Sequence, residues 1–426
     1  MSKQFSKISI VGLGYVGLPL SLQFARSGVS VLGFDLDQKK VDSINAGQTY
    51  LKHFPSESIA DQVDANRFEA TTDPSRLIEV EAILICVPTP LDDHREPDLS
   101  YVLATARTIA PYLSKGVLIT LESTTYPGTT EDELRVALEE GSGMKAGVDF
   151  HLAYSPERED PGREDASVKT IPKVVGGYTS KCGDIADALY SQALDQIYRV
   201  SSCRAAEATK LLENIFRSVN IALVNELKVV YEAMGIDVHE VIDAAATKPF
   251  GFMAFRPGPG LGGHCIPIDP FYLTWKAREF GKNTRFIELA GEINTAMPDY
   301  VISKVADVLN EEGKSIKGSK ILVLGLAYKA NVDDCRESPS FVLMEKLEKK
   351  GATIQYHDKY VPEVPPTREH SHFTGKKSVD IEDQYDLILL STDHKEYKTF
   401  DFTSFQAPLV DTRNCIQMKP TKYFQA

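Results

Sequence analysis

The sequence lacks the features that mark membrane and secreted proteins. Its 426 residues contain no apolar run that approaches the ~18 residues of a membrane span. The first residues pass directly into an apolar strand, without the hydrophobic region of a signal peptide. The six cysteines include no CxxC pair, so they fit reduced thiols better than a disulfide framework. We therefore expect a cytoplasmic protein with no membrane segment.

Positive charge is also in short supply. The chain has 47 Lys and Arg against 60 Asp and Glu, which gives a formal net charge of −13. We expect no nucleic acid partner, because phosphate backbones need a cationic surface. A small anionic substrate stays compatible with this charge, since it needs only a local cluster of Lys and Arg. The nine histidines are scattered and predict no metal site.

Strands alternate with helices at both ends of the chain. In the first 200 residues, strands are expected at Lys7–Val11, Val29–Phe34, Ala82–Val87, Val117–Leu121 and His151–Tyr154. Further strands are expected at Lys320–Leu324, Thr353–His357, Asp386–Leu390 and Pro408–Asp411. This alternation predicts two Rossmann-like, doubly wound parallel sheets. The segment Tyr360–Lys377, rich in Pro, His and charge, is expected to be a surface excursion.

A long helix separates the two α/β regions. The run from Arg204 to Met234 has no Pro or Gly and carries apolar residues at helical spacing. It predicts one helix of ~45 Å that links two domains and packs against another subunit. We expect an N-terminal Rossmann-like domain at 1–203, a small helical domain at 204–312 and a C-terminal Rossmann-like domain at 313–426.

A glycine-rich turn near the N-terminus indicates a dinucleotide site. The spacing GxGxxG follows the apolar strand KISIV and opens an apolar helix, so a pyrophosphate would sit against the helix N-terminus. The residues expected to contact the cofactor here are Gly12, Gly14, Tyr15, Val16 and Gly17. The competing interpretation is an ordinary glycine turn without a ligand.

Asp35 closes the next strand, 21 residues after Gly14. A carboxylate at this place binds a ribose 2′-hydroxyl and repels a 2′-phosphate, which favours NAD over NADP. Asp35 or Asp37 as a plain helix cap is the alternative. Lys40, one turn further on, either reaches the adenosine side of the cofactor or is a solvated lysine.

Cys265 lies in the segment PGPGLGGHCIPIDPFY, just before an expected helix start. Asp269 and Pro270 have the residue types of a helix N-cap and first helical position, and a helix N-terminus lowers the pKa of a thiol. A buried structural cysteine is the competing interpretation. Beside a dinucleotide site, a reactive thiol indicates oxidation of an alcohol through the aldehyde to the acid.

Eight motifs carry a resemblance to a known family. They are GLGYVGLPL (12–20), CVPTP (86–90), ESTTYPGTT (122–130), SPER (155–158), AEATKLLEN (206–214), GGHCIPIDP (262–270), GLAYKANVDDCRESP (325–339) and DTRN (411–414). In this order, the chain resembles the UDP-glucose/GDP-mannose dehydrogenases over nearly its whole length. His264 and Ile268 stand where the UDP-glucose branch has serine and lysine. The loop is most similar to the UDP-N-acetylglucosamine 6-dehydrogenases.

The resemblance implies a four-electron oxidation of the sugar C6 hydroxyl, with two hydrides passed to two NAD⁺. Cys265 would hold the aldehyde as a thiohemiacetal and then as a thioester. Lys210 and Asn214, four residues apart on the long helix, would stabilise the oxyanion and orient the substrate. Glu157 would act with water as a general base, and Asp269 would add a carboxylate. Pro161 stands where the UDP-glucose branch has a second acidic residue.

The resemblance also implies further contacts. Those to the substrate are Arg158, Glu159, Lys210, Asn214, Arg217, Arg256, Gly260, Tyr328, Lys329 and Arg413. Those to the cofactor are Thr89, Thr124 and Arg336. His264 is expected to serve structure or substrate contact. A homodimer or higher homo-oligomer across the long helix is implied, together with a role in surface polysaccharide synthesis.

Several alternatives stay open at this point. The same reaction on UDP-N-acetylmannosamine, UDP-N-acetylgalactosamine or UDP-glucose differs only in the sugar. A two-electron hydroxyacid dehydrogenase of the 6-phosphogluconate type would share the first fold and the long helix but would not need Cys265. A cofactor-sensing binding module without activity is the alternative outside the enzymes.

Overall fold

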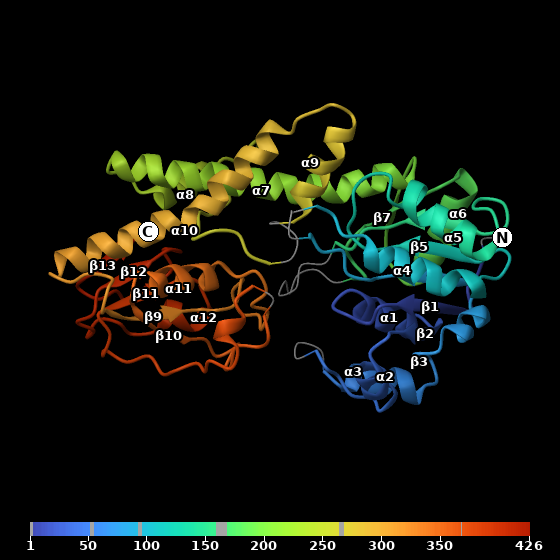
Figure 1. Ribbon diagram of the computed structural model, residues 1–426, viewed down its shortest axis with the longest axis horizontal. Helices are drawn as coiled ribbons and strands as arrows, with labels where there is room; N and C mark the ends of the chain where they lie inside the picture. Colours follow the sequence, from blue (N-terminus) through green and yellow to red (C-terminus); the bar gives the residue numbers. More distant parts are fainter. Residues whose placement is uncertain (1–2, 52–54, 93–95, 159–167, 264–267, 368) are drawn as a thin grey trace. The chain divides into compact units, whose positions relative to one another are not determined.

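The computed structural model describes residues 3–51, 55–92, 96–158, 168–263, 268–367 and 369–426. Cys265, His264, Glu159 and Pro161 therefore lie outside the described residues. The chain folds into two compact units. Unit 1 comprises residues 1–213 and 271–283, and unit 2 comprises residues 214–270 and 284–426. Figure 1 shows the helices and strands of both units.

Unit 1 is built on an eight-stranded sheet of order β3-β2-β1-β4-β5-β6-β7-β8. Its strands are β1 (Lys7–Val11), β2 (Ser30–Phe34), β3 (Phe68–Thr71), β4 (Ala82–Ile85), β5 (Leu118–Leu121), β6 (His151–Tyr154), β7 (Lys173–Gly177) and β8 (Ile197–Val200). All neighbouring pairs are parallel except β6 and β7, which are antiparallel. The order reverses between β1 and β4, and this switch point is where doubly wound sheets bind ligands.

Helices cover both faces of this sheet. They are α1 (Gly17–Arg26), α2 (Gln38–Asn45), α3 (Glu57–Asp64), α4 (Ser100–Ile109), α5 (Arg135–Ser142) and α6 (Ser180–Tyr190), with short helical turns η1 (Pro74–Glu79), η2 (Ala110–Tyr112) and η3 (Thr130–Leu134). Along β4, Ala82 and Leu84 join the apolar core beneath α1 and α6, whereas Ile83 and Ile85 join the core beneath α4 and α5. Because strand side chains alternate between the two faces, each face receives its own core.

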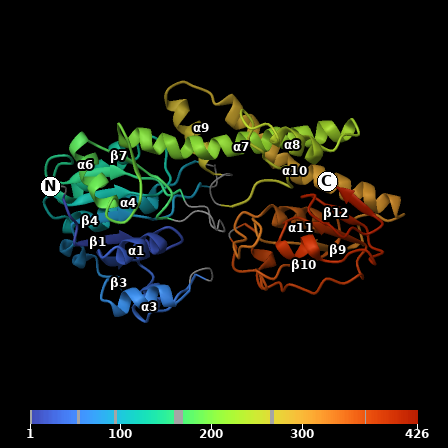
Figure 2. The same cartoon turned by 180° about the vertical axis from the view of Figure 1, so that it is seen from behind.

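The predicted long helix is present as α7 (Cys203–Ala233). Three further helices follow: α8 (Val238–Ala246), α9 (Asp269–Glu279) and α10 (Arg285–Glu311). In unit 2, α10 runs beside the C-terminal half of α7 (Figure 2), and a hydrogen bond of 2.8 Å joins Asn225 of α7 to Asn294 of α10. Helix α9 begins at Asp269 itself, one residue earlier than the predicted N-cap position implies.

Unit 2 contains a five-stranded, entirely parallel sheet of order β10-β9-β11-β12-β13. Its strands are β9 (Lys320–Leu324), β10 (Thr353–His357), β11 (Leu387–Leu390), β12 (Leu409–Asp411) and β13 (Tyr423–Gln425). Its other helices are α11 (Pro339–Lys349), the turn η4 (Ser371–Phe373) and α12 (Lys395–Thr399). One core lies against α10 and α11, and another lies on the opposite face around Tyr397 and Phe402.

Two α/β regions with mainly parallel sheets, joined by α7, confirm the predicted fold class. In the part of the chain that the structure describes, no helix combines the length and the apolar character that a membrane crossing requires.

Candidate active site

The glycine turn after β1 has the shape of a pyrophosphate cradle. Gly12 has a φ of +91°, and a Cβ there would lie 2.7 Å from the carbonyl oxygen of Cys86. A Cβ on Gly17 would lie 1.9 Å from the oxygen of Gly12, so both positions exclude a side chain. At Gly14 a Cβ would meet no atom within 4 Å. The turn is tight at its first and third glycines and open at its second, which fits a pyrophosphate at the N-terminus of α1.

Asp35 follows β2 directly and holds this turn. Its Oδ2 accepts a hydrogen bond of 2.8 Å from the backbone N–H of Leu13, and its Oδ1 accepts one of 2.9 Å from Asp37. The ammonium of Lys40 lies 3.1 Å from Oδ2. Lys40 is thus paired with the carboxylate that the sequence predicts for ribose binding. Tyr15 is 40% exposed, and Val16 is the residue before α1.

Thr89 and Thr124 follow neighbouring strands and meet at the carboxyl edge of the sheet. The hydroxyl of Thr89 donates a hydrogen bond of 2.7 Å to the backbone oxygen of Thr124. The hydroxyl of Tyr272, from α9, donates to the backbone oxygen of Thr89. The two threonines predicted to line the cofactor are therefore brought together, at the edge where open parallel sheets bind ligands.

The SPER segment is held by the start of α7. Lys210 is buried, and its ammonium donates to the backbone oxygen of Glu157. The backbone N–H of Arg158 donates to the carboxylate of Glu157 at 2.7 Å, while the guanidinium of Arg158 lies 2.6 Å from Glu213. Two residues that the resemblance makes catalytic, Lys210 and Glu157, thus lie against each other although 53 positions separate them.

A buried ionic network lies behind Glu157, and the sequence did not reveal it. Lys173 pairs with Glu122 at 2.6 Å and lies 3.5 Å from Glu157. Tyr190 donates its hydroxyl to the other oxygen of Glu122. Burial by itself would lower the pKa of Lys173, but the neighbouring carboxylates outweigh burial and raise it. The only sequence signal was a lysine placed directly before the apolar pair Val174–Val175.

In unit 2, two further residues that the resemblance makes catalytic, Asn214 and Asp269, are in contact. The amide of Asn214 donates to the carboxylate of Asp269, and the guanidinium of Arg217 donates to the oxygen of Asn214. Asn214 and Asp269 are both buried. The predicted nucleophile, Cys265, precedes Asp269 by four positions and lies outside the described residues.

The glycine-rich loop before Cys265 packs against the segment after β9. The N–H of Gly263 donates to the backbone oxygen of Arg336 at 3.3 Å, and a Cβ on Gly263 would lie 2.7 Å from the ring of Tyr328. Gly260 has a φ of +135°. At Gly258 a Cβ would lie 2.4 Å from the guanidinium of Arg413. Residues predicted to bind substrate from three separate motifs are therefore gathered in one place.

Two predicted contact residues have their charge engaged elsewhere. Arg256 is half-exposed and bonds Asp243. The guanidinium of Arg336 binds Asp334 through Nε at 2.9 Å and Nη2 at 2.6 Å. Lys329, half-buried beside Tyr328, lies in the same segment. The charges of Arg256 and Arg336 are thus balanced by carboxylates of unit 2.

Asn225 is a further residue that sequence analysis missed. It is fully buried on α7; its oxygen accepts from the N–H of Gly258 at 2.9 Å, and its amide donates to Asn294 at 2.8 Å. Asn294 in turn donates to the backbone oxygen of Ser218. This network fixes the start of the glycine-rich loop. A polar residue at a core position of an apolar helical pattern was the available signal.

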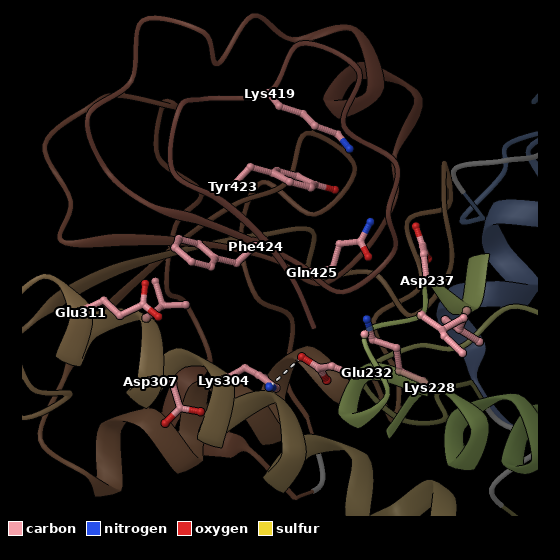
Figure 3. A pocket seen from close by; sticks show the side chains of 14 residues that line it. Lys228, Glu232, Asp237, Lys304, Asp307, Glu311, Lys419, Tyr423, Phe424 and Gln425 are labelled. Atoms are coloured by element: carbon pink, nitrogen blue, oxygen red, sulfur yellow. Dashed lines mark ion pairs between the residues drawn. The ribbon is translucent and has the colours of Figure 1, made fainter. Parts of the chain in front are cut away.

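The pocket shown in Figure 3 is separate from these residues. It has a volume of about 750 Å³ and is lined by the ends of α7 and α10, the start of α8 and the C-terminal segment. Its wall carries the ion pair of Lys304 and Glu232, at 2.7 Å. Lys228, also in its wall, follows Asn214 by 14 positions on α7, or ~21 Å at 1.5 Å per residue. None of the predicted site residues that the structure describes lines this pocket.

In the part of the chain that is described, no group of three or more His, Cys, Asp or Glu is placed to hold a metal ion.

The chain matches three family models in succession. They are the NAD binding domain (residues 6–194), the central domain (204–296) and the UDP binding domain (322–418) of the UDP-glucose/GDP-mannose dehydrogenase family. It is 34% identical to the UDP-N-acetyl-D-glucosamine 6-dehydrogenase of Pseudomonas aeruginosa, over 92% of this chain and 91% of that protein. It is 36% identical to the UDP-N-acetyl-D-mannosamine dehydrogenase of Escherichia coli K12, over 93% and 96%.

Solved structures agree with this assignment. The UDP-D-ManNAc dehydrogenase of Pyrococcus horikoshii superposes with a TM-score of 0.88 at 32% identity and covers 98% of both chains. The NDP-N-acetyl-D-galactosaminuronic acid dehydrogenase of Methanosarcina mazei has a TM-score of 0.82 at 31% identity, over 99% of this chain and 94% of that chain. With its glycine cradle, its NAD binding domain and its UDP binding domain, the chain belongs to the UDP-glucose/GDP-mannose dehydrogenase family of NAD-dependent oxidoreductases.

Proposed function

We propose that this protein oxidises the C6 hydroxyl of UDP-N-acetylglucosamine to the uronic acid, with two NAD⁺ consumed per sugar. The hydrogen bond between Asn214 and Asp269 is the observation that carries this proposal. It joins the long helix to the start of α9, which follows Cys265 by four positions in the sequence. An oxidation that stopped at the aldehyde would need no thiol in this place.

The proposed chemistry uses a covalent intermediate. The glycine turn after β1 would hold NAD⁺, which would supply the hydride acceptor for each oxidation. Cys265 adds as a thiolate to the aldehyde and gives a thiohemiacetal, whose oxidation leaves a thioester. Lys210 and Asn214 donate to the oxygen on which negative charge develops. Glu157 accepts a proton from the water that hydrolyses the thioester.

Cations in unit 2 would bind the UDP diphosphate. Arg413 lies against the glycine-rich loop, and Lys329 and Tyr328 follow β9. Arg217, on the same face of α7 as Asn214, would contact the sugar. Arg158 and Glu159 would belong to the sugar loop, while Arg256 and Arg336 would have to leave their carboxylate partners to reach a ligand. A local cluster of this kind satisfies an anionic substrate despite the net charge of −13.

The sequence around Cys265 supports our choice of sugar. His264 and Ile268 replace the serine and lysine of the UDP-glucose branch, and relatives of similar identity bear the names of UDP-N-acetylglucosamine and UDP-N-acetylmannosamine dehydrogenases. We propose the glucosamine sugar first and the mannosamine epimer second.

A panel of UDP-sugars tests this choice. We expect kcat/KM for UDP-N-acetylglucosamine to exceed that for its mannosamine and galactosamine epimers and for UDP-glucose by at least about tenfold, a difference of ~1.4 kcal/mol. NADH release gives the rates, and product mass confirms a carboxylate. Preference for another sugar would reassign the substrate but would leave the reaction type intact.

We also propose a homodimer across α7, in a cytoplasmic enzyme that supplies surface polysaccharide synthesis. Exposed apolar side chains form a stripe along this helix: Leu212, Phe216, Leu223 and Val230 are 44–66% exposed. Their spacing of four and seven residues places them on one side of the helix. Exposed apolar surface of this extent is typical of subunit contacts.

A further inference from the structure

Two buried side chains beside Glu157 have no part in the proposed chemistry. Lys173 is 5% exposed and Glu122 is 1% exposed. Their charged atoms lie 2.6 Å apart, and the ammonium also lies 3.5 Å from Glu157. A buried ion pair stabilises a fold little, since apolar residues of similar volume are often as good or better. The position of this pair therefore calls for a role beyond folding.

Strand direction brings the three side chains together. Because β5 and β6 are parallel, Glu122 and Glu157, which follow them, lie at the same edge of the sheet. β7 runs antiparallel to β6, so its first residue, Lys173, lies at that edge as well. The register pairs Tyr154 with Gly176. Continued for three residues, the same register sets Glu157 opposite Lys173.

The network has a fixed end and an open end. At the fixed end, Tyr190 donates its hydroxyl to Glu122, and the ammonium of Lys173 lies 5.6 Å from the centre of the Tyr190 ring. At the open end, the side chain of Glu157 is 16% exposed. A cation held rigidly on one side of a carboxylate favours its ionised form and fixes the direction of its oxygens.

We propose that Lys173, anchored by Glu122 and Tyr190, is the positioning residue that keeps the Glu157 carboxylate ionised and oriented as the base for thioester hydrolysis. This inference rests on the proposed function. In the hydrolysis step, a water oxygen bonds to the thioester carbon while Glu157 takes a water proton. The C–S bond then breaks, the sulfur of Cys265 leaves with the electron pair, and no electrons pass to NAD⁺.

The test separates hydrolysis from hydride transfer. In K173M, both oxidations still proceed, so stopped-flow traces show a burst of two NADH per active site. The steady-state rate then falls about 100-fold, the usual worth of a general base, and intact mass spectrometry finds the acylated enzyme. K173R keeps the cation and retains most of the rate. K169M, which removes a lysine that is 59% exposed four residues earlier, behaves as the unchanged enzyme.

A second variant protects the test against misfolding. K173M leaves Glu122 buried without its cation, whereas K173M/E122Q removes both charges and keeps a partner for Tyr190. The double variant folds and shows the same burst. Hydroxylamine, which attacks the thioester directly and releases a hydroxamate, restores turnover in both variants. A purely structural defect gains nothing from hydroxylamine.

The pH dependence supplies an independent readout. Loss of the cation moves the half-maximal pH of hydrolysis upward, because a lone carboxylate holds its proton more readily. The other titratable groups at this network, Cys86, Tyr190 and Lys210, are present in all variants. A uniform slowing of both hydrides without a burst, or full activity in K173M, overturns the inference. A single NADH per sugar in the unchanged enzyme instead overturns the proposed function.

Discussion

At the scale of single residues, sequence analysis was most specific for two kinds of position. These are glycines where the backbone leaves no room for a side chain, and residues that directly follow a strand. Gly12 and Gly17 leave no room for a side chain, so the spacing of the glycines indicated the turn after β1. Asp35 directly follows the last residue of β2, so its position is set by the strand. Lys173 and Asn225 were missed because their role depends on partners 16 or more positions away, and no spacing rule connects such residues.

Asp35 gives a prediction at this scale. D35A removes the carboxylate that holds Leu13 and that we propose binds the ribose, so we expect KM for NAD⁺ to rise at least about tenfold, the worth of a hydrogen bond to a charged group. Initial rates with varied NAD⁺ measure this. D42A, an exposed change on the following helix, is the control and leaves KM unchanged. Equal KM values for D35A and D42A would show that Asp35 does not serve the cofactor.

At the scale of elements, strand ranges were predicted accurately where the apolar residues form a clear pattern. The ranges predicted for β1, β6, β9 and β10 coincide with the observed strands, since every residue after the first is buried or half-buried in each of them. Missed strands are short or weakly patterned. β7 reads KVVGG, with two glycines and a lysine, and β13 has only three residues. After β5, helical structure begins as the turn η3 and continues as α5 to Ser142.

The segment Tyr360–Lys377 was predicted wrongly in part. Val361, Val364 and Phe373 are each no more than 3% exposed and join the core beneath α11. Composition alone indicated a surface excursion, because proline, histidine and charge dominate the segment. Three isolated apolar residues without a strand or helix period gave no sign of this packing.

Glu207 makes a pH-dependent link between elements. It lies on α7 and accepts hydrogen bonds from the N–H groups of Gly128 and Thr130, at 2.6 and 2.9 Å. Burial raises the pKa of Glu207 to about 7, although these hydrogen bonds lower it. Between its ordinary value of 4.5 and about 7, the folded state holds a proton that the unfolded state has lost. Stability therefore falls as pH rises through this window.

The variant E207Q tests this link. It has no carboxylate to ionise, so its free energy of unfolding, relative to the unchanged protein, should rise between pH 4.5 and pH 7. The expected change is on the order of 3 kcal/mol. Urea unfolding at several pH values measures it, with E226Q, an exposed change on the same helix, as the control. Parallel stability curves for E207Q and the unchanged protein would contradict the account.

At the scale of the whole molecule, the family membership and the α/β architecture were both predictable, because eight motifs of the family occur in order along the chain. For assembly, the sequence offered only the homo-oligomer that the family resemblance implies. The exposed apolar stripe on α7 supports a dimer, and its side chains could not be identified from the sequence, since Leu211 and Leu212 have the same residue type and opposite burial.

The stripe predicts how assembly responds to charge. L223E introduces a carboxylate at a position that is 52% exposed on α7, so light scattering should find a mass of one 47.1 kDa chain in place of two. V148E changes an apolar residue that is 81% exposed outside α7 and should leave the dimer intact. A dimer that survives L223E would place the interface elsewhere.

The central claim is an oxidation that passes through a thioester on Cys265, and the ratio of NADH formed to sugar consumed tests it most directly. With limiting UDP-N-acetylglucosamine, the account predicts two NADH and one uronic acid per sugar. C265A should bind NAD⁺ normally and form no acid. One NADH per sugar in the unchanged enzyme, or undiminished acid formation by C265A, would contradict the account.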